Sequence, residues 1–419
     1  MTTSVTFDYL TLGELPHQDD SIDKREWQEH SPININADNP NIQITYSDQW
    51  TLPSEAYIQI TGEIVKNADG SSYGDGDKVG LVNNGPMFLF KRLTYKIDNQ
   101  VVEEVTNPGV AFLMTSLVDY SDDYLNVMGK QLIVIKDTAN NDTKNTNTGF
   151  VKRKSHKKFG VCIPLKHIFG FARGFNKVVY GVNHALDMLI DNAYANALYR
   201  KNDVDAAKVK LSRLSLWMPR VHPSPKSSVN LFDFIKSGKK LRAPFQRVQY
   251  HTNQFVTLNT LKWNIAHFDL KDRPRHVFVA LQLQDKNNDQ AAHNGIFDPC
   301  ALTTISLKVN GTDYPNQPYL IKLANKEVGR PYMDLLGYKS FIDRYNSGML
   351  ITKSDFMARY PVYHFNLEQM PDLSTSTSMF ELEAKLAAGG AYDVHVVISA
   401  DCDTNFYGEG ARMRLKMTK

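Results

Sequence analysis

The sequence predicts an all-β protein built from two similar halves, and a repeated pattern supports this prediction. Residues 93–99 alternate between apolar and polar side chains and end in a turn-forming pair. Residues 305–311 repeat this pattern 212 positions later (305 − 93), close to half of the 419 residues. The pairs, Asp-Asn and Asn-Gly, are typical of a tight β-hairpin turn. A second strand follows each turn, and Pro108 and Pro331 then begin helix-like runs.

The first half consists mainly of short segments with the period-two alternation of β-strands. Loops rich in Gly, Asp, Ser and Asn separate them. The half closes with a long strand over residues 209–218, where the apolar residues change phase, and such a change predicts a β-bulge. The other expected strands outside the repeated hairpin are residues 42–46, 57–64, 131–135, 161–165, 177–180 and 185–190.

The second half follows the same plan. Its segment 276–283 is apolar on both faces, as expected for a strand that is covered on both sides. Each half offers about eight strands and one inserted helix, which suits a jelly roll of two packed sheets. The sequence therefore predicts two consecutive eight-stranded jelly rolls with short inserted helices, because helices are too sparse for a parallel β-α-β fold. The remaining expected strands are residues 247–250, 257–265, 362–367, 379–384 and 394–398.

The chain divides into four parts. Residues 1–30 are polar and rich in Asp and Glu, and we expect them to form an N-terminal arm outside the core. Residues 31–222 form the first jelly roll and residues 244–419 the second. The linker, residues 223–243, contains prolines, serines, a short helix and a basic run. Two domains are expected because 419 residues exceed the size at which one core keeps growing.

Composition and charge exclude several classes of function. With 42% hydrophobic and 22% charged residues, the chain has the composition of an ordinary folded protein. The 48 basic and 45 acidic residues give a net charge of +3, without the clear basic excess of a dedicated nucleic-acid binder. The N-terminus lacks the features of a signal peptide, and no stretch approaches the ~20 apolar residues of a membrane helix. We therefore expect synthesis in the cytosol and no secretion.

Two short motifs suggest chemistry, but their surroundings favour ordinary loops. Residues 70–74 match G-x-S-x-G, the nucleophile motif of α/β-hydrolases, which requires a strand before the serine and a helix directly after it. Turn-forming residues follow instead. Asp69, Asp75 and Asp77 lie close together, but their spacing fails the EF-hand pattern and lacks its closing Glu. We therefore expect no enzyme activity and no metal site from these residues.

The histidines and cysteines also lack the spacing of a metal site. His276, His364 and His395 fall within strand patterns, so we expect them to be hydrogen-bonded core or interface residues. We expect no cofactor. The cysteines are odd in number, far apart and close to apolar segments, which favours buried free thiols in a protein made in a reducing compartment: Cys162, Cys300 and Cys402.

The densest basic run lies in the first half and comprises Lys152, Arg153, Lys154, Lys157 and Lys158. Three interpretations are open. The run is a nuclear import signal, a surface that contacts the phosphates of nucleic acid, or a solvated loop, since short charged runs are common on surfaces.

Four segments carry a resemblance to a known family. Residues 82–99 contain VNN, LF and LTYKIDN in this order, and residues 214–223 read LSLWMPRVHP. Residues 275–281 read RHVFVAL, and residues 310–315 combine NG with YP. Together they resemble the double jelly-roll, or hexon-like, major capsid proteins of the Polinton/Maverick and adintovirus type. The chain departs from the family pattern at Ala280-Leu281-Gln282, where the family has Gly-Phe, and at residues 285–289, where DKNND replaces the family's D-x-D-A-F-N-G.

The resemblance implies a viral major capsid protein whose pseudo-hexagonal homotrimers tile an icosahedral shell. Its implied partners are further copies of itself, a single jelly-roll penton protein, minor capsid proteins and, by weak non-specific contact, the genome. Residues 67–80, 136–149 and 284–298 are then loops that form towers or contacts between capsomers. The implied location is the virion, after synthesis in the host cytosol, and assembly in the nucleus and an internal membrane are left open.

Two other classes compete with this interpretation. A two-domain β-sandwich binding module, such as a lectin or adhesin, fits the same strands but lacks a secretion signal. A bicupin-like enzyme requires His and Glu clusters on a pair of strands, and the sequence offers none. The oligomeric state discriminates between them, because trimers and shells favour a capsid protein and a monomer favours a binding module.

Overall fold

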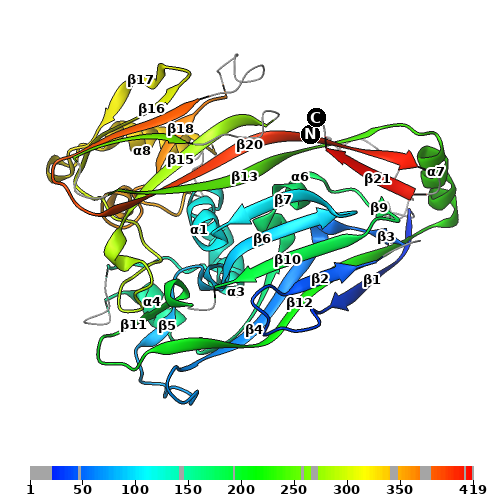
Figure 1. The fold of residues 1–419 in the computed structure, drawn as a ribbon, viewed down its shortest axis with the longest axis horizontal. Helices are drawn as coiled ribbons and strands as arrows, with labels where there is room; N and C mark the ends of the chain where they lie inside the picture. Colours follow the sequence, from blue (N-terminus) through cyan, green and yellow to red (C-terminus); the bar gives the residue numbers. More distant parts are fainter. Residues whose placement is uncertain are drawn as a thin grey trace, which may run out of the picture.

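The structure is a computed structural model in which two β-rich halves lie side by side (Figure 1). The described residues are 21–45, 49–140, 146–191, 194–255, 259–265, 272–339, 348–368, 379–409 and 412–417. Residues 1–20 of the predicted arm therefore lie outside the described residues.

The first half is built from two antiparallel sheets and a short two-stranded ribbon. Its strands are β1 (Ile22–His30), β2 (Asn41–Ile44), β3 (Trp50–Thr51), β4 (Tyr57–Lys66), β5 (Val79–Leu81), β6 (Phe90–Ile97), β7 (Gln100–Thr106), β8 (Lys158–Pro164), β9 (Val179–Tyr180), β10 (His184–Ile190), β11 (Leu198–Arg200) and β12 (Ala207–Pro223). The larger sheet has the order β8-β4-β12-β3-β9, with β1 also paired to β12. The smaller has the order β2-β10-β6-β7, and β11 pairs with β5.

The second half repeats the two-sheet arrangement. Its strands are β13 (Leu241–Phe255), β14 (Thr260–Ile265), β15 (Arg273–Leu283), β16 (Leu302–Val309), β17 (Thr312–Leu320), β18 (Tyr363–Asn366), β19 (Phe380–Leu386), β20 (Tyr392–Glu409) and β21 (Arg412–Met417). One sheet has the order β13-β20-β15-β18, with β21 on β20, and the other has the order β14-β19-β16-β17. Strand β21, which carries Arg412, Arg414 and Lys416, is thus an edge strand.

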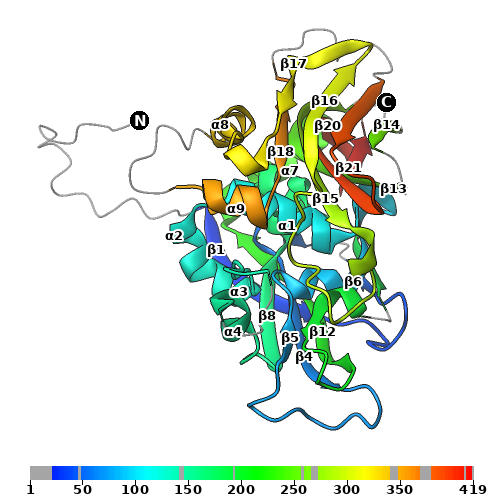
Figure 2. The same cartoon turned by 90° about the vertical axis from the view of Figure 1, so that its left-hand side faces the viewer.

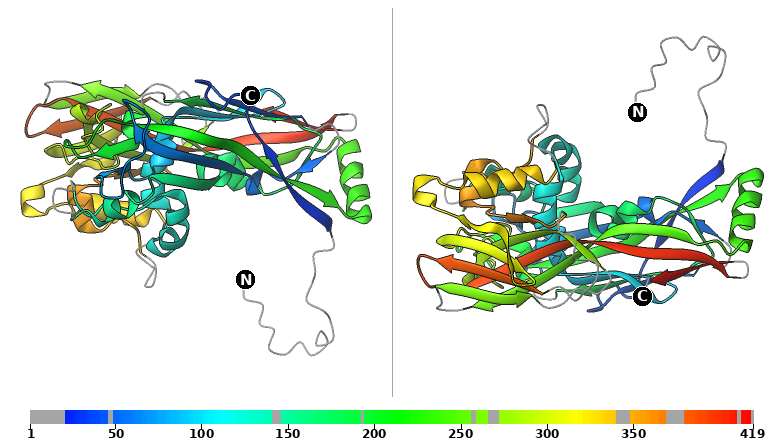
Figure 3. Two further views of the ribbon diagram at one scale, coloured as in Figure 1. Left: turned by 90° about the horizontal axis from the view of Figure 1, so that it is seen from below. Right: turned by 90° about the horizontal axis from the view of Figure 1, so that it is seen from above.

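Short helices join and cover the sheets. They are α1 (Pro108–Asp119), α2 (Asp122–Tyr124), α3 (Lys130–Leu132), α4 (Thr148–Arg153), α5 (Leu165–Ile168), α6 (Gly170–Gly174), α7 (Pro225–Lys236), α8 (Gly329–Gly337) and α9 (Lys353–Ala358). Helices α2, α4, α8 and α9 gather on one side of the molecule (Figure 2). Helix α7 lies at one end of the long axis, where the chain passes from one half to the other (Figure 3). Within the described ranges, no helix has the length and apolar character needed to span a membrane.

The repeated hairpin is present in both halves. Strands β6 and β7 are joined at Asp98 and Asn99, whose φ angles are +47° and +64°. Strands β16 and β17 are joined at Asn310 and Gly311, with φ angles of +50° and +82°. Two successive left-handed residues define the type I′ turn that the sequence pairs predict. Helices α1 and α8 follow, so the predicted order of elements is confirmed in each half.

The structure also confirms the predicted bulge and extends the first sheet. The register between β12 and β4 shifts between Leu211 and Arg213, where the apolar phase changes. Residues 22–30, which were expected within the N-terminal arm, instead form strand β1. This charged strand is held at β12 by ion pairs, including Arg213 Nη2 to Glu29 Oε2 at 2.5 Å. A polar strand has no apolar alternation to reveal it.

One predicted strand is wrong. Residues 131–135 form the end of α3 and an irregular segment, in which Ile133 has φ of +56°. The side chains of Leu132, Ile133 and Val134 are nevertheless buried. A short apolar run indicates burial, but it does not by itself distinguish a strand from a buried loop.

The core lies between the sheets of each half. Strand β15 is buried along nearly its whole length, as its two-sided apolar pattern predicts. Strand β4 alternates between buried and half-buried residues, as expected for a strand with one covered face. The predicted all-β fold of two consecutive jelly rolls with short inserted helices is confirmed.

Candidate functional site: the seam between the two jelly rolls

The two jelly rolls share one continuous apolar core, so the seam between them belongs to the interior of the molecule. Phe171 of α6 packs against Phe245 of β13 and Phe406 of β20, with ring centroids 5.6 and 6.2 Å apart. The backbones also approach closely, because a Cβ atom on Gly170 would lie 1.6 Å from the carbonyl oxygen of Gln246. Such packing leaves little freedom for one jelly roll to move against the other.

Polar groups cross the seam as well, and Asp137 is the centre of one cluster. The side chains of Asp137 and Arg153 are 0% exposed and form an ion pair. From the second jelly roll, Tyr360 Oη accepts a hydrogen bond from the backbone N–H of Asp137 at 3.0 Å, and His293 Nε2 lies 3.2 Å from Asp137 Oδ1. Burial alone raises the pKa of Asp137, but Arg153 and His293 lower it well below its usual range. The carboxylate is therefore ionised and paired.

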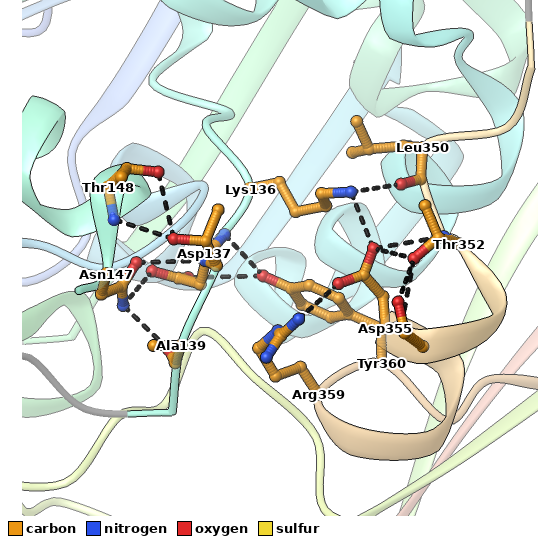
Figure 4. A network of polar contacts seen from close by, with 12 residues as sticks. Lys136, Asp137, Ala139, Asn147, Thr148, Leu350, Thr352, Asp355, Arg359 and Tyr360 are labelled. Atoms are coloured by element: carbon orange, nitrogen blue, oxygen red, sulfur yellow. Dashed lines mark hydrogen bonds and ion pairs between the residues drawn. The ribbon is translucent and has the colours of Figure 1, made fainter.

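A second cluster surrounds Asp355 at the start of α9 (Figure 4). Lys136 of the first jelly roll donates hydrogen bonds to the Leu350 carbonyl oxygen and to Asp355 Oδ2, both at 2.8 Å. Thr352 caps the helix and Arg359 Nη2 contacts Asp355 Oδ1 at 2.6 Å. Burial raises the pKa of Asp355, but these donors lower it to about 2. A single lysine thus ties the first jelly roll to a helix cap of the second.

Glu103 on β7 forms a third connection. It is 1% exposed, and its Oε2 accepts a hydrogen bond from the Phe171 N–H at 3.1 Å. Its Oε1 accepts one from the Val248 N–H in the second jelly roll at 3.3 Å. Burial raises the pKa of Glu103 to about 7, although these backbone donors oppose the shift. This carboxyl group therefore changes protonation near neutral pH.

The loop at residues 284–298 also belongs to the seam. Gln290 contacts the backbone of Ala207 in both directions, donating at 2.6 Å and accepting at 2.9 Å. The Arg200 N–H donates to the Gln290 carbonyl oxygen at 2.8 Å. This loop therefore packs against the first jelly roll of its own chain, and its expected role in a tower or in a contact between capsomers stays a prediction.

The three strand histidines are buried and hydrogen-bonded, as expected. His364 Nε2 lies 3.2 Å from His276 Nδ1, and His395 Nδ1 lies 2.7 Å from Tyr250 Oη. Burial lowers the pKa of each histidine to about 4. The imidazoles are therefore neutral at neutral pH.

The structure divides the predicted basic run. Arg153 is the fully buried partner of Asp137, so it is not available to a ligand. Lys152 and Lys158 are exposed, and Lys154 and Lys157 are half-buried. These four lysines are called the basic surface below. Two of them make local contacts, because Lys157 donates to the Gly74 carbonyl oxygen and Lys158 Nζ lies 3.8 Å from Glu63 Oε1.

The remaining candidate residues lie in ordinary loop and core positions. Ser72, the serine of the G-x-S-x-G motif, donates to Glu63 Oε1 at 2.6 Å, and the next regular element is strand β5. Asp69 and Asp77 accept hydrogen bonds from their own loop. In the described part of the chain, no three His, Cys, Asp or Glu side chains are grouped as a metal site. Cys300 and Cys402 are buried free thiols, whereas Cys162 is half-buried.

Sequence reasoning did not find the seam clusters. The residues around Asp137 come from positions 147, 153, 293 and 360, and nothing in their spacing reveals that they meet. Arg153 gives no local signal either, because Lys152 and Lys154 flank it and the run is typical of an exposed loop.

The fold and the seam define the class of this molecule. Two consecutive antiparallel sandwiches, each with a hairpin followed by a helix, are fused through one core with buried ion pairs. This is a double jelly-roll protein.

Comparison with known proteins agrees. The chain belongs to the double jelly roll-like family, whose domain model matches residues 79–389. No curated protein sequence matches the chain. Among solved structures, a chain of the Sputnik virophage is similar with 12% identity and a TM-score of 0.61, covering 100% of this chain and 93% of that one. The Faustovirus major capsid protein has 8% identity and a TM-score of 0.56, covering 94% and 92%. The mavirus major capsid protein has 11% identity and a TM-score of 0.54, covering 94% and 90%.

Proposed function

We propose that this protein is a viral major capsid protein, which acts as a structural building block and not as an enzyme. One observation carries the proposal: two similar sandwiches are held in a fixed mutual orientation by an interior seam. Three such chains around an axis present six similar sandwiches, which gives a near-hexagonal tile from a cyclic trimer. Such tiles suit an icosahedral shell. The resemblance in the segments at residues 82–99 and 214–223 supports the Polinton/Maverick and adintovirus type.

The buried charges of the seam fit this role. Breaking a buried ion pair is costly, because an unpaired charge is left in the interior. Ion pairs that cross between the two jelly rolls therefore resist changes in their angle. A lectin or a two-domain enzyme does not require such a fixed angle, whereas a tile does.

Further copies of the chain are the proposed partners. Leu320, Met333 and Met379 are 50–61% exposed on the second jelly roll. Large apolar side chains at the surface are stabilised when a neighbour covers them. Sheet edges are likewise protected in an assembly, because neighbouring copies cover their unpaired backbone groups.

Further parts of the proposal concern the domains, the genome and the location. The two jelly rolls comprise residues 31–222, whose larger sheet strand β1 extends, and residues 244–419, joined by the linker 223–243. The part of the N-terminal arm that precedes β1 contacts neighbouring capsomers. The basic surface makes weak, non-specific contact with the genome. A single jelly-roll penton protein and minor capsid proteins complete the shell, and the protein resides in the virion after synthesis in the host cytosol, with nuclear assembly as one route.

Expression of the chain with and without a penton protein tests this function. We expect particles that sediment far ahead of the free protein and show closed or sheet-like shells of hexagonal units in negative-stain micrographs. A protein that remains a monomer at all concentrations and binds a glycan on an array contradicts the proposal and favours the lectin-like binding module.

A further inference from the structure

A cavity of about 210 Å³ lies between the two jelly rolls, apart from the ion-pair clusters described above. Its apolar walls include Phe88, Phe90 and Val110 of the first jelly roll. Its polar wall is the face of β20 that carries Asp393 and His395. The volume is below the roughly 300–1,000 Å³ of pockets for drug-sized molecules, so an occupant is small.

The register of the sheet explains why these polar groups share one wall. Asp393 is opposite Gln254 on β13 and Gln282 on β15. Two residues further along β20, His395 is opposite Thr252 and Ala280. Residues two apart on a strand point to the same face. The alternate β20 residues, beginning with Val394 and Val396, are apolar and buried, so the polar row is confined to the face at the cavity.

Three buried polar atoms in the cavity lining, two on β20 and one in the loop at residues 284–298, have no hydrogen-bond partner. They are Asp393 Oδ1, Asn294 Oδ1 and His395 Nε2, in residues that are 2%, 3% and 5% exposed. The other carboxylate oxygen of Asp393 accepts a hydrogen bond from Asn287 Nδ2, and His395 Nδ1 is bonded to Tyr250 Oη. Unpartnered buried polar atoms cost free energy, and this cost is relieved when a ligand supplies the missing partners.

The charge balance of the cavity favours a cation. Lys91 Nζ lies 3.6 Å from Asp191 Oδ1, so these two charges of the lining offset each other. Asp393 has amide partners, Asn287 and Gln254, but no cationic partner, and burial raises the pKa of its carboxyl group. Two of the three unpartnered atoms are oxygen acceptors. A ligand with N–H donors and a positive charge satisfies them, and apolar walls suit a short methylene chain.

We propose that this cavity binds a small aliphatic amine in its ammonium form, of the polyamine class. The ammonium group donates hydrogen bonds to Asp393 Oδ1 and Asn294 Oδ1, and the methylene chain packs on Phe88, Phe90 and Val110. Because the walls come from both jelly rolls, the amine also strengthens the seam. The proposal does not depend on capsid assembly, since it concerns a site within one chain.

Thermal unfolding and calorimetry of the full chain with putrescine test the proposal. We expect putrescine at millimolar concentration to raise the unfolding midpoint in a saturable manner. Its neutral analogue 1,4-butanediol, and KCl at matched ionic strength, should not. Asp393→Asn should weaken putrescine binding about 10- to 100-fold, as expected for the loss of one charge-assisted hydrogen bond. Asp203→Asn, at an exposed position, is the matched control and should bind as the parent chain does.

Three results overturn the proposal: no saturable shift with putrescine, an equal shift with KCl, or unchanged binding in Asp393→Asn. If Asp393→Asn does not fold, Val110→Phe provides a second test, because it adds a ring to the apolar wall and leaves Asp393 intact. Putrescine binding that persists at full affinity in Val110→Phe places the amine outside the cavity and contradicts the proposal.

Discussion

Replacement of Asp137 by Asn tests how much the buried ion pair of Asp137 and Arg153, at the centre of the polar cluster beside the seam, contributes to stability. Asn keeps the size of the side chain and removes its charge, while Arg153 stays 0% exposed. Arg153 Nε then still donates to the Leu81 carbonyl oxygen at 3.0 Å, but its positive charge has lost its counterion. Breaking a buried pair in this way costs about 3–5 kcal/mol. We therefore expect a loss of this size in the free energy of unfolding.

Equilibrium unfolding in guanidinium chloride, followed by tryptophan fluorescence, measures this loss. Asp403→Asn is the matched control, because its partner Arg242 is largely exposed and exposed pairs contribute little. The double variant Asp137→Asn/Arg153→Met should recover part of the stability, since it also removes the unpaired charge. If Asp137→Asn is no more destabilising than Asp403→Asn, the buried pair does not stabilise the fold and the reasoning is refuted.

Three further predictions concern pH, a turn and nucleic acid. Burial raises the pKa of Glu103 to about 7, above its ordinary 4.5, so the stability that the bound proton confers is complete below pH 4.5 and is lost as the pH rises to 7. The difference between the two pKa values corresponds to about 3 kcal/mol in the free energy of unfolding. Glu103→Gln should remove this pH dependence, and a pH profile that is the same as that of the parent chain contradicts the prediction. Gly311 has φ of +82°, and an added Cβ would meet no neighbouring atom, so backbone strain alone should make Gly311→Ala cost about 1 kcal/mol in thermal unfolding. Gly337→Ala in α8 is the control and should be neutral or stabilising. Equal effects of the two substitutions refute the turn argument. Substitution of all four lysines of the basic surface by Gln should weaken the binding of the protein to duplex DNA and reduce the salt dependence of that binding. Unchanged binding assigns these lysines to a solvated loop.

The fold was predictable from the sequence because its strongest signals are local. A hairpin pair such as Asn310-Gly311 specifies a turn through the φ angles that these residues tolerate. The two-sided apolar pattern of β15 likewise reports its burial on both faces. Strand β1 was missed because its contacts with β12 are made by charged side chains, and the sequence alone does not show which strand accepts them.

The candidate site was not predictable for a different reason. Arg153 sits within a basic run and reads as a surface residue, but Asp137 lies 16 positions away and makes it an interior one. Glu103 resembles an exposed residue of a hairpin strand, and only the approach of α6 and β13 gives it two backbone donors. Burial of a charge depends on partners that the fold brings together, so periodicity cannot reveal it.

The mass and outline of the purified chain test the central claim most directly. Native mass spectrometry together with negative-stain class averages should give a trimer of 3 × 47.5 kDa, about 143 kDa, with a near-hexagonal outline made of six similar lobes. A particle of 47.5 kDa with two lobes at every concentration would contradict the account, because a capsid tile built from this double jelly roll requires three copies.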